Sequence, residues 1–259
     1  MPDLHVNSVR YALQPCEEVS FENPQRVEFE TDEARFCLAD GTLTCQMKMH
    51  FADAAEARRA VEPAIRAWEV DADLRLGRSG LRFRFDGADV VDRTPPPPGV
   101  VNAYAFVGGA GAVTATGTVS VHVSRATYPD PPPASFRVNP DAERILVRYQ
   151  RYLDGREPLQ GMAHYCLTFV EKKARTKKKQ REKAAKLYHI DLPVVNKMGE
   201  LTSTRGDANS ARKAGASQPL TGPEHAWLEA AVKMLIWRLG DTRSSAALPK
   251  ITMADLPNL

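Results

Sequence analysis

Cysteine is scarce in this chain of 259 residues, and its four copies form no Cys-x-x-Cys pair. Cys16, Cys37, Cys45 and Cys166 are spread along the sequence, which excludes a zinc ribbon and a thioredoxin-type motif. We expect them to be buried free thiols. The six histidines are equally dispersed and form no His-Glu-x-x-His run. The sequence therefore predicts no metal site and no cofactor.

Long apolar runs and nucleotide loops are missing as well. No apolar run approaches the roughly 18 residues that a membrane-spanning helix requires. The N-terminal residues, MPDLHVNSVRYAL, contain no basic segment followed by an apolar one, so they do not resemble a secretory signal. The cluster Gly108-Gly109-Ala110-Gly111 does not have the G-x-G-x-x-G spacing and is typical of a hairpin turn. We expect a cytoplasmic protein with no membrane partner.

What the chain does contain is typical of a globular protein, with 43% hydrophobic and 26% charged residues. Two proline clusters, at 95–98 and 128–133, indicate extended connections, and the hydrophobic periodicity changes from strand-like to helical after the second one. We therefore predict an α+β protein. Its parts are a β-rich recognition domain at residues 1–135, a helical domain at 136–241 and a C-terminal tail at 242–259.

The N-terminal domain is predicted to be an antiparallel sheet with one or two helices. Apolar and polar residues alternate in short segments, which are residues 6–13, 19–21, 26–29, 35–38, 42–49 and 81–85. Asp40-Gly41 is a hairpin signal because both residues tolerate positive φ. A helix should begin after Asp53, and Pro63 either kinks it or starts a second helix. Its core face is predicted to contain Val61, Ile65, Trp68 and Ala72.

The C-terminal domain is predicted to be a bundle of four or five helices. The clearest signals lie at residues 143–154, 158–170, 192–202 and 221–239, where apolar residues recur at steps of three and four. The last of these segments begins with Thr221-Gly222-Pro223-Glu224, which has the pattern of a capping box. We expect the first two helices to pack as a pair.

Charge is distributed unevenly, although the net charge is only +3. Residues 171–186, EKKARTKKKQREKAAK, hold nine Lys or Arg against Glu171 and Glu182. Such an excess can neutralise phosphates, or it can be a solvated helix extension. No aromatic residue is interleaved for base stacking. Residues 184–198 also resemble a helix-turn-helix superficially, but no glycine occupies its turn at Tyr188-His189.

The order of the helical segments resembles the HEPN-like bundles of bacterial defence and stress proteins, including ApeA-type proteins of abortive phage infection. The resemblance runs from ERILVRYQRYL through GMAHYCLTFVE and GELTSTRGDANSARK to LTGPEHAWLEAAVKMLIWRL. In catalytic members an Arg-x4-6-His motif cleaves RNA, with the histidine as acid or base. Arg205 matches the arginine, but Ser210, Ala211 and Arg212 stand where the histidine is required. The resemblance therefore implies a bundle without nuclease chemistry.

The segment TRGDANSARK, residues 204–213, remains open to two interpretations. It is either a polar loop that caps backbone groups, or an anion site in which Arg205, Arg212 and Lys213 contact phosphate, since arginine suits bidentate phosphate contacts. A ribonuclease with a non-standard site is the enzymatic alternative. It would require folding to bring His164 or His225 beside Arg205.

Our leading hypothesis is a non-catalytic bacterial accessory protein that binds RNA or another polyanion, in the phage-defence or stress context that the resemblance implies. A protein-interaction module without a nucleic-acid role is the other alternative, and a homodimer is compatible with the exposed faces. The residues expected to contact a polyanion are Lys172, Lys173, Arg175, Lys177, Lys178, Lys179, Arg181, Lys183, Arg205, Arg212 and Lys213.

Overall fold

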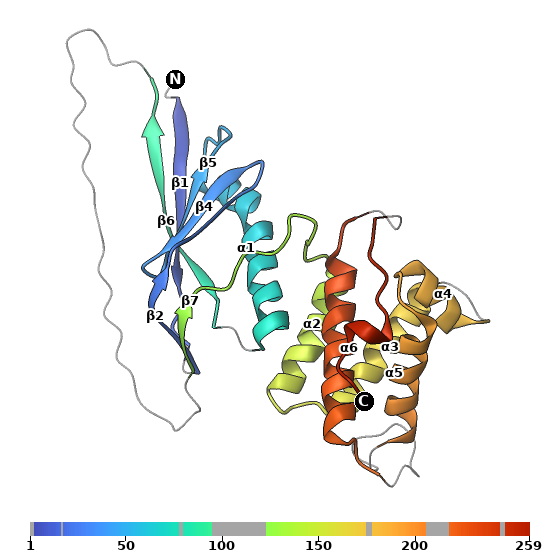
Figure 1. Cartoon of the computed structure of the whole chain (residues 1–259). Coiled ribbons are helices and arrows are strands. Elements are labelled where there is room, and N and C mark those ends of the chain that lie inside the picture. The colour runs from blue at the N-terminus through green and yellow to red at the C-terminus, as the bar shows by residue number, and fades with distance from the viewer. Residues whose placement is uncertain are drawn as a thin grey trace, which may run out of the picture. The chain divides into compact units, whose positions relative to one another are not determined.

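The computed structural model describes residues 3–16, 18–77, 80–94, 123–174, 178–205, 218–243 and 247–259. It confirms the α+β architecture, with a β-rich region followed by helices (Figure 1). The chain forms two compact units. The sheet unit contains Met1–Asp73 and Arg78–Pro131, and the helical unit contains Leu74–Gly77 and Pro132–Leu259, so the division falls within the second proline cluster.

Five antiparallel strands form the main sheet, in the order β3-β4-β5-β1-β6. These are β1 (Leu4–Leu13), β3 (Val27–Glu30), β4 (Ala34–Ala39), β5 (Thr42–Met47) and β6 (Phe83–Asp92). Asp40 and Gly41 both have positive φ between β4 and β5, which confirms the predicted hairpin. A separate parallel pair joins β2 (Val19–Gln25) to β7 (Val123–Thr127). The predicted hairpin at Gly108-Gly109 lies outside the described residues.

Helix α1 (Ala54–Leu76) covers one face of this sheet (Figure 1). The Glu56 backbone N–H donates to the Asp53 carboxylate at 2.7 Å, so Asp53 starts the helix as predicted. The helix continues through Pro63 as one element. Its predicted core face is confirmed, because Trp68 and its neighbours on that face are buried. The indole N–H of Trp68 donates to the Pro129 carbonyl at 3.0 Å, which satisfies its only donor.

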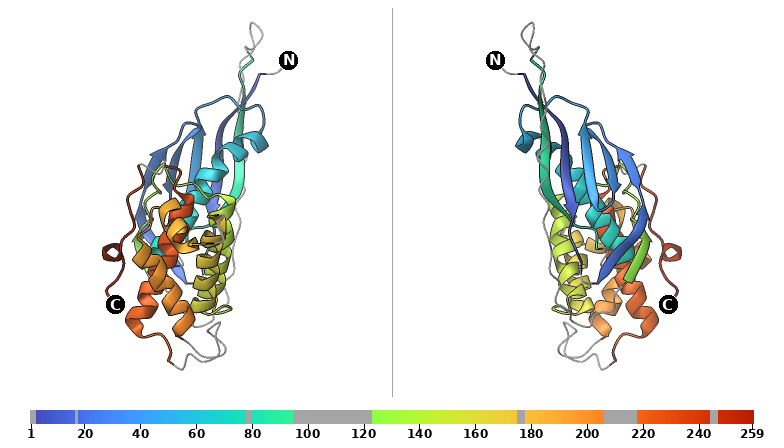
Figure 2. Two further views of the ribbon diagram at one scale, coloured as in Figure 1. Left: turned by 90° about the vertical axis from the view of Figure 1, so that its right-hand side faces the viewer. Right: turned by 90° about the vertical axis from the view of Figure 1, so that its left-hand side faces the viewer.

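Among the described residues, the helical unit has five α-helices, which agrees with the predicted four or five. They are α2 (Pro140–Leu153), α3 (Leu159–Lys173), α4 (Gln180–Leu187), α5 (Leu192–Thr204) and α6 (Gly222–Gly240). Helices α3 and α6 contact each other, and each also contacts α2 and α5; the four lie side by side in Figure 2. The capping box at Thr221 and Glu224 is confirmed. Helix α4 forms inside the basic run of residues 171–186.

The residues after α6, separated above as a tail, belong to the helical unit. Ile251 forms a parallel bridge with Ile190 in the turn before α5. Its N–H donates to the His189 carbonyl at 2.9 Å, and its carbonyl accepts from the Asp191 N–H at 2.8 Å. Ile251 and Leu256 are buried, and a short 3-10 helix, η1 (Met253–Asp255), lies between them. Burial of two apolar side chains fixes this segment on the bundle.

The cysteines are free thiols, as expected, but only two of them are buried. Cys45 and Cys166 lie in the cores of the sheet unit and the helical unit, whereas Cys16 and Cys37 are partly exposed. Burial raises the pKa of the Cys45 thiol to about 12, so this thiol stays protonated at neutral pH. No helix within the described residues is long and apolar enough to span a bilayer.

Candidate nucleic-acid interface

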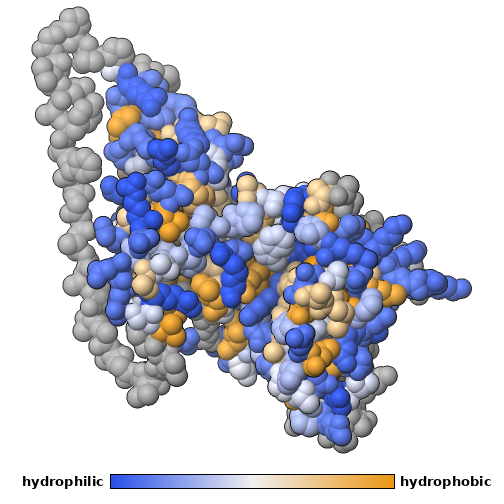
Figure 3. Space-filling view, in the orientation of Figure 1, coloured by the Kyte–Doolittle hydropathy of each residue, from blue (hydrophilic) through white to orange (hydrophobic). Residues whose placement is uncertain are grey.

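Three exposed lysines lie on α4 and at its start, and we call them the α4 lysine stripe: Lys179, Lys183 and Lys186. Lys183 and Lys186 are three residues apart on the same face of the helix, and Lys179 is its N-cap, with a left-handed backbone. The inward positions are Ala184 and Ala185, whose small side chains are buried and bring α4 close to the bundle. The surface over α4, at the right of Figure 3, is mostly hydrophilic. The helix therefore presents its cations to solvent.

The end of α3 and the segment before α4 add two further exposed lysines, Lys172 and Lys178. Within the stripe, Lys179 forms an ion pair with Glu182 at 3.0 Å, and both side chains are at least half exposed. A pair so exposed contributes little and exchanges readily for another anion. The Lys179 ammonium is thus available to a ligand.

Two other cations of the predicted set hold the helices together. The Lys173 ammonium lies 2.7 Å from the Asp141 carboxylate, which links α3 to the start of α2. The Arg181 Nε donates to Glu171 at 3.1 Å, and its guanidinium covers Gly199 of α5 so closely that a side chain there would collide with it. We therefore assign Lys173 and Arg181 to packing of the helices and keep the exposed lysines as the interface.

Arg205 is partly buried, and its donors are also engaged within the protein. Its guanidinium donates to the Glu224 carboxylate from Nε at 3.1 Å and to the Gln218 side chain from Nη1 at 2.8 Å. Glu224 accepts the Thr221 backbone N–H as well, and this bond, with Arg205, holds the pKa of Glu224 below its usual value. Arg205 thus fastens the end of α5 to the start of α6. Four members of the predicted set, Arg175, Lys177, Arg212 and Lys213, lie outside the described residues.

The two histidines considered for catalysis lie on different helices. His164 of α3 contacts Thr168 at 3.4 Å. His225 follows Glu224 on α6, so the chain brings it near Arg205, and its Nε2 lies 3.4 Å from the Tyr152 hydroxyl of α2. The side chain of His225 thus contacts α2, whereas Arg205 contacts its neighbour Glu224.

A polar cluster between α2 and α6 escaped the sequence analysis. Tyr149 and Tyr152 donate to the two oxygens of Glu229 at 3.2 and 3.1 Å, and Lys233 pairs with Glu229 at 2.9 Å. Burial and the Glu229 charge raise the pKa of Tyr152, so this hydroxyl remains a donor at neutral pH. The signal was the spacing of His225, Glu229 and Lys233 at intervals of four. The cluster joins the two helices.

The segment interpreted as a helix-turn-helix does contain two helices joined by a short turn. In this turn His189, rather than a glycine, adopts a positive φ of 52°. The outward positions of α5, however, are Pro193, Asn196, Glu200 and Thr204. Lys197 pairs with Glu200 at 2.9 Å. Because this face offers neither arginine nor an unpaired lysine among the described residues, α5 is poorly suited to enter a nucleic-acid groove.

Neither metal ligands nor a comparison with known proteins identifies another functional site in the described part of the chain. Within the described residues, no three His, Cys, Asp or Glu side chains are grouped as metal ligands. No protein-family model, curated protein or solved structure matches the chain. The geometry of its own residues is therefore the basis for the functional proposal.

Proposed function

We propose that the protein binds RNA or another polyanion through the α4 lysine stripe and the neighbouring Lys172, without cleaving it. The observation that carries this proposal is the exposure of Lys183 and Lys186 on a helix that buries only alanines, with Lys179 exposed at its N-cap. The eight residues of α4 span roughly 12 Å along the axis, so cations at its two ends can contact more than one phosphate.

The chemistry of this surface favours backbone contacts over base recognition. Lysine ammonium groups act as point charges toward phosphate, and their binding is driven by release of counterions. The nearby aromatic residue, Tyr188, is partly buried at the end of α4 and its hydroxyl has a pKa raised by burial. We therefore expect weak sequence preference and steep salt dependence.

The resemblance to HEPN-like bundles supplies a biological context for the proposal. It favours a cytoplasmic bacterial accessory protein of phage defence or stress response, in which the sheet unit recognises a ligand or protein partner. A homodimer fits the same context.

A charge-reversal triplet tests the interface. The stripe variant combines Lys179→Glu, Lys183→Glu and Lys186→Glu. The matched control combines Arg84→Glu, Arg151→Glu and Arg156→Glu. These arginines are exposed at other places on the surface, and their replacement changes the net charge by the same amount. Labelled RNA and DNA are incubated with each protein, and binding and product length are followed together. We expect the stripe variant to lose at least tenfold in affinity, and the control to lose clearly less, with the nucleic acid intact.

Three results would count against the proposal. Equal losses in both variants would show only an effect of net charge. Unchanged binding in the stripe variant would move the interface elsewhere, and no binding by the unmodified protein would favour the protein-interaction alternative.

The ribonuclease alternative is supported by one observation, the position of Arg205 beside the first turn of α6, which carries His225. In that case His225 would be the acid or base, and Arg205 would have to exchange Glu224 for phosphate. His225→Asn tests this alternative without disturbing the ion pair. Cleavage that disappears in His225→Asn would support it, and RNA left intact by the unmodified protein would remove it.

A further inference from the structure

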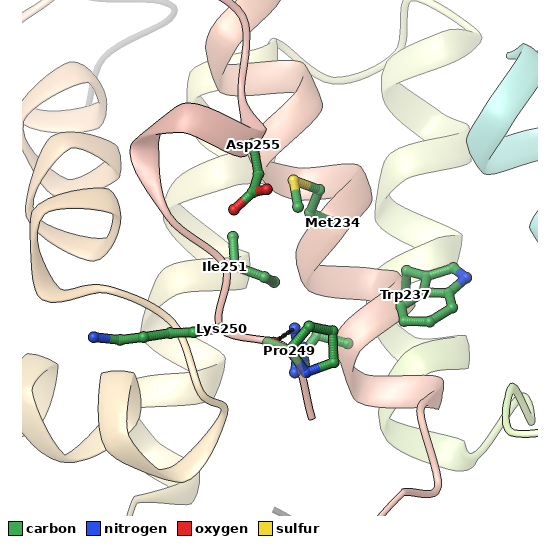
Figure 4. Close-up of a pocket in the computed structure, with 7 residues that line it drawn as sticks. Met234, Trp237, Pro249, Lys250, Ile251 and Asp255 are labelled. Atoms are coloured by element: carbon green, nitrogen blue, oxygen red, sulfur yellow. Dashed lines mark hydrogen bonds between the residues drawn. The ribbon is translucent and has the colours of Figure 1, made fainter. Parts of the chain in front are cut away.

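A cavity of about 200 Å³ lies between α6 and the C-terminal segment (Figure 4). Its walls are mainly apolar and include Met234 and Trp237 from α6 and Pro249 and Ile251 from the segment. The hydrogen bonds between Ile251 and residues 189 and 191 fix the outer wall. The cavity is therefore already present in the helical unit. Its volume is too small for a polymer and large enough for a small molecule.

One side chain in its wall carries a buried charge. Arg238 of α6 is only 4% exposed, and its Nη2 donates to the Pro249 carbonyl at 2.6 Å. Its Nε and Nη1 are buried without a hydrogen-bond partner among the described residues. Burial lowers the pKa of this guanidinium, yet arginine stays charged in proteins. An arginine in this state lacks the partner that a buried charge normally has.

The carboxylates near Arg238 are engaged by other groups. Asp255, which also lines the cavity, accepts the Thr252 N–H at 2.7 Å and its hydroxyl at 2.8 Å, which caps η1. Asp241 raises the pKa of Arg238, but its carboxylate is engaged by Arg243, whose Nε, Nη2 and backbone N–H all donate to it. The positive charge of Arg243 in turn lowers the pKa of Arg238.

The other cation of the wall, Lys250, is directed away from the cavity in Figure 4 and pairs with Asp191. Within the described chain, Arg238 therefore has no ion-pair partner of its own.

We propose that this cavity binds a small hydrophobic carboxylic acid whose carboxylate pairs with Arg238. A planar or aliphatic body would contact Met234, Trp237 and Ile251, since thioether and indole groups pack well against rings. Size supports the assignment, because an apolar cavity of about 150 Å³ accommodates benzene. Arginine binds carboxylates with two parallel hydrogen bonds. Nη1, which is now unsatisfied, and the second N–H of Nη2 would form this pair once the Arg238 side chain turns them toward the cavity.

This site is independent of the α4 lysine stripe. The stripe is solvated and contacts a polymer by charge alone, whereas the cavity is apolar and holds one arginine. Loss of either activity would leave the other intact, so the two proposals fail separately.

Benzoate and benzamide are suitable probes, since they differ in charge and little in shape. Binding of each is measured by isothermal titration calorimetry to the full chain and to Arg238→Met, which replaces the charge with an apolar side chain of similar length. We expect benzoate to bind the unmodified protein at least tenfold more tightly than benzamide, and Arg238→Met to abolish that preference.

A second variant keeps the test valid if Arg238→Met does not fold. Met234→Trp retains Arg238 and fills the cavity, so it should lose benzoate binding while its circular dichroism is unchanged. Equal affinity for both probes, undetectable benzoate binding at millimolar concentration, or undiminished binding in folded Met234→Trp would each overturn the proposal.

Discussion

Helices α4 and α6 belong to the same unit but differ in where their positive charges lie. Helix α4 has eight residues, buries two alanines and exposes its lysines. Helix α6 has nineteen residues, buries ten of them, and includes Arg238 among the buried ones. Arg205, just after α5, is likewise held by Glu224 of α6. The contrast teaches that burial and partners, rather than the local density of Lys and Arg, decide which cations can meet a ligand.

The largest effect on stability should come from adding a side chain at the crowded end of α6. A methyl group at Gly240 would lie 2.5 Å from the Phe136 ring and 2.8 Å from the Arg137 carbonyl, and the backbone cannot move aside easily. We expect Gly240→Ala to lower the free energy of unfolding by about 1–3 kcal/mol, as overpacking does. Urea denaturation measures the change.

Gly222→Ala is the control for this crowding, because no atom lies within 4 Å of the added methyl group at the other end of α6. Its effect should stay within about 0.5 kcal/mol. Similar values for the two variants would contradict the tight packing described for the end of α6.

The next largest effect concerns the ion pair of Arg205. Glu224→Gln should cost about 1–2 kcal/mol, because it leaves a mostly buried guanidinium without its carboxylate and weakens the cap of α6. The matched change on α4 is Glu182→Gln, which removes the partner of the exposed Lys179 and should cost less than about 0.5 kcal/mol. Denaturation of both variants compares the pairs directly. A larger loss from Glu182→Gln would reverse the contrast.

Acid should reduce the difference in stability between the unmodified protein and Glu224→Gln. The pKa of Glu224 is lowered in the folded protein relative to 4.5, first by the Thr221 backbone hydrogen bond. Its contribution is therefore fully present above pH 4.5 and is lost as pH falls through the folded value. Urea midpoints at pH 7 and pH 3 should show a gap at neutral pH that narrows in acid. A gap that widens in acid would have the wrong sign.

The smallest effect should be that of a single stripe lysine on stability. Lys183→Ala removes an exposed side chain and should change the free energy of unfolding by less than about 0.5 kcal/mol. Thermal unfolding is the readout. A loss of more than 1 kcal/mol would mean that Lys183 takes part in packing and would weaken its assignment to the interface.

Local patterns predicted the elements well. The alternation around Val27 and Phe29, the Asp40-Gly41 turn and the Thr221 capping box each depend on neighbouring residues, and the structure contains all three. The parallel pairing of β2 with β7 could not be predicted, because it joins segments about a hundred residues apart.

The candidate sites were only partly visible in the sequence for the same reason. Lys173 and Asp141 lie on different helices, and Arg205 follows α5 whereas Glu224 lies on α6, so a local count treats these cations as free. Arg238 has the position of an ordinary basic residue in the last turn of a helix. Its burial comes from Pro249 and the C-terminal segment, which no periodicity links to α6.

The most direct test of the central claim is the salt dependence of RNA binding by the unmodified protein and by a neutral triplet, Lys179→Gln, Lys183→Gln and Lys186→Gln. Each phosphate contact contributes roughly 0.7 to the slope of log affinity against log salt for a single strand. If the stripe contacts phosphate, the triplet should reduce the slope by about 2. Parallel lines with the same slope would contradict the assignment of α4 as the interface.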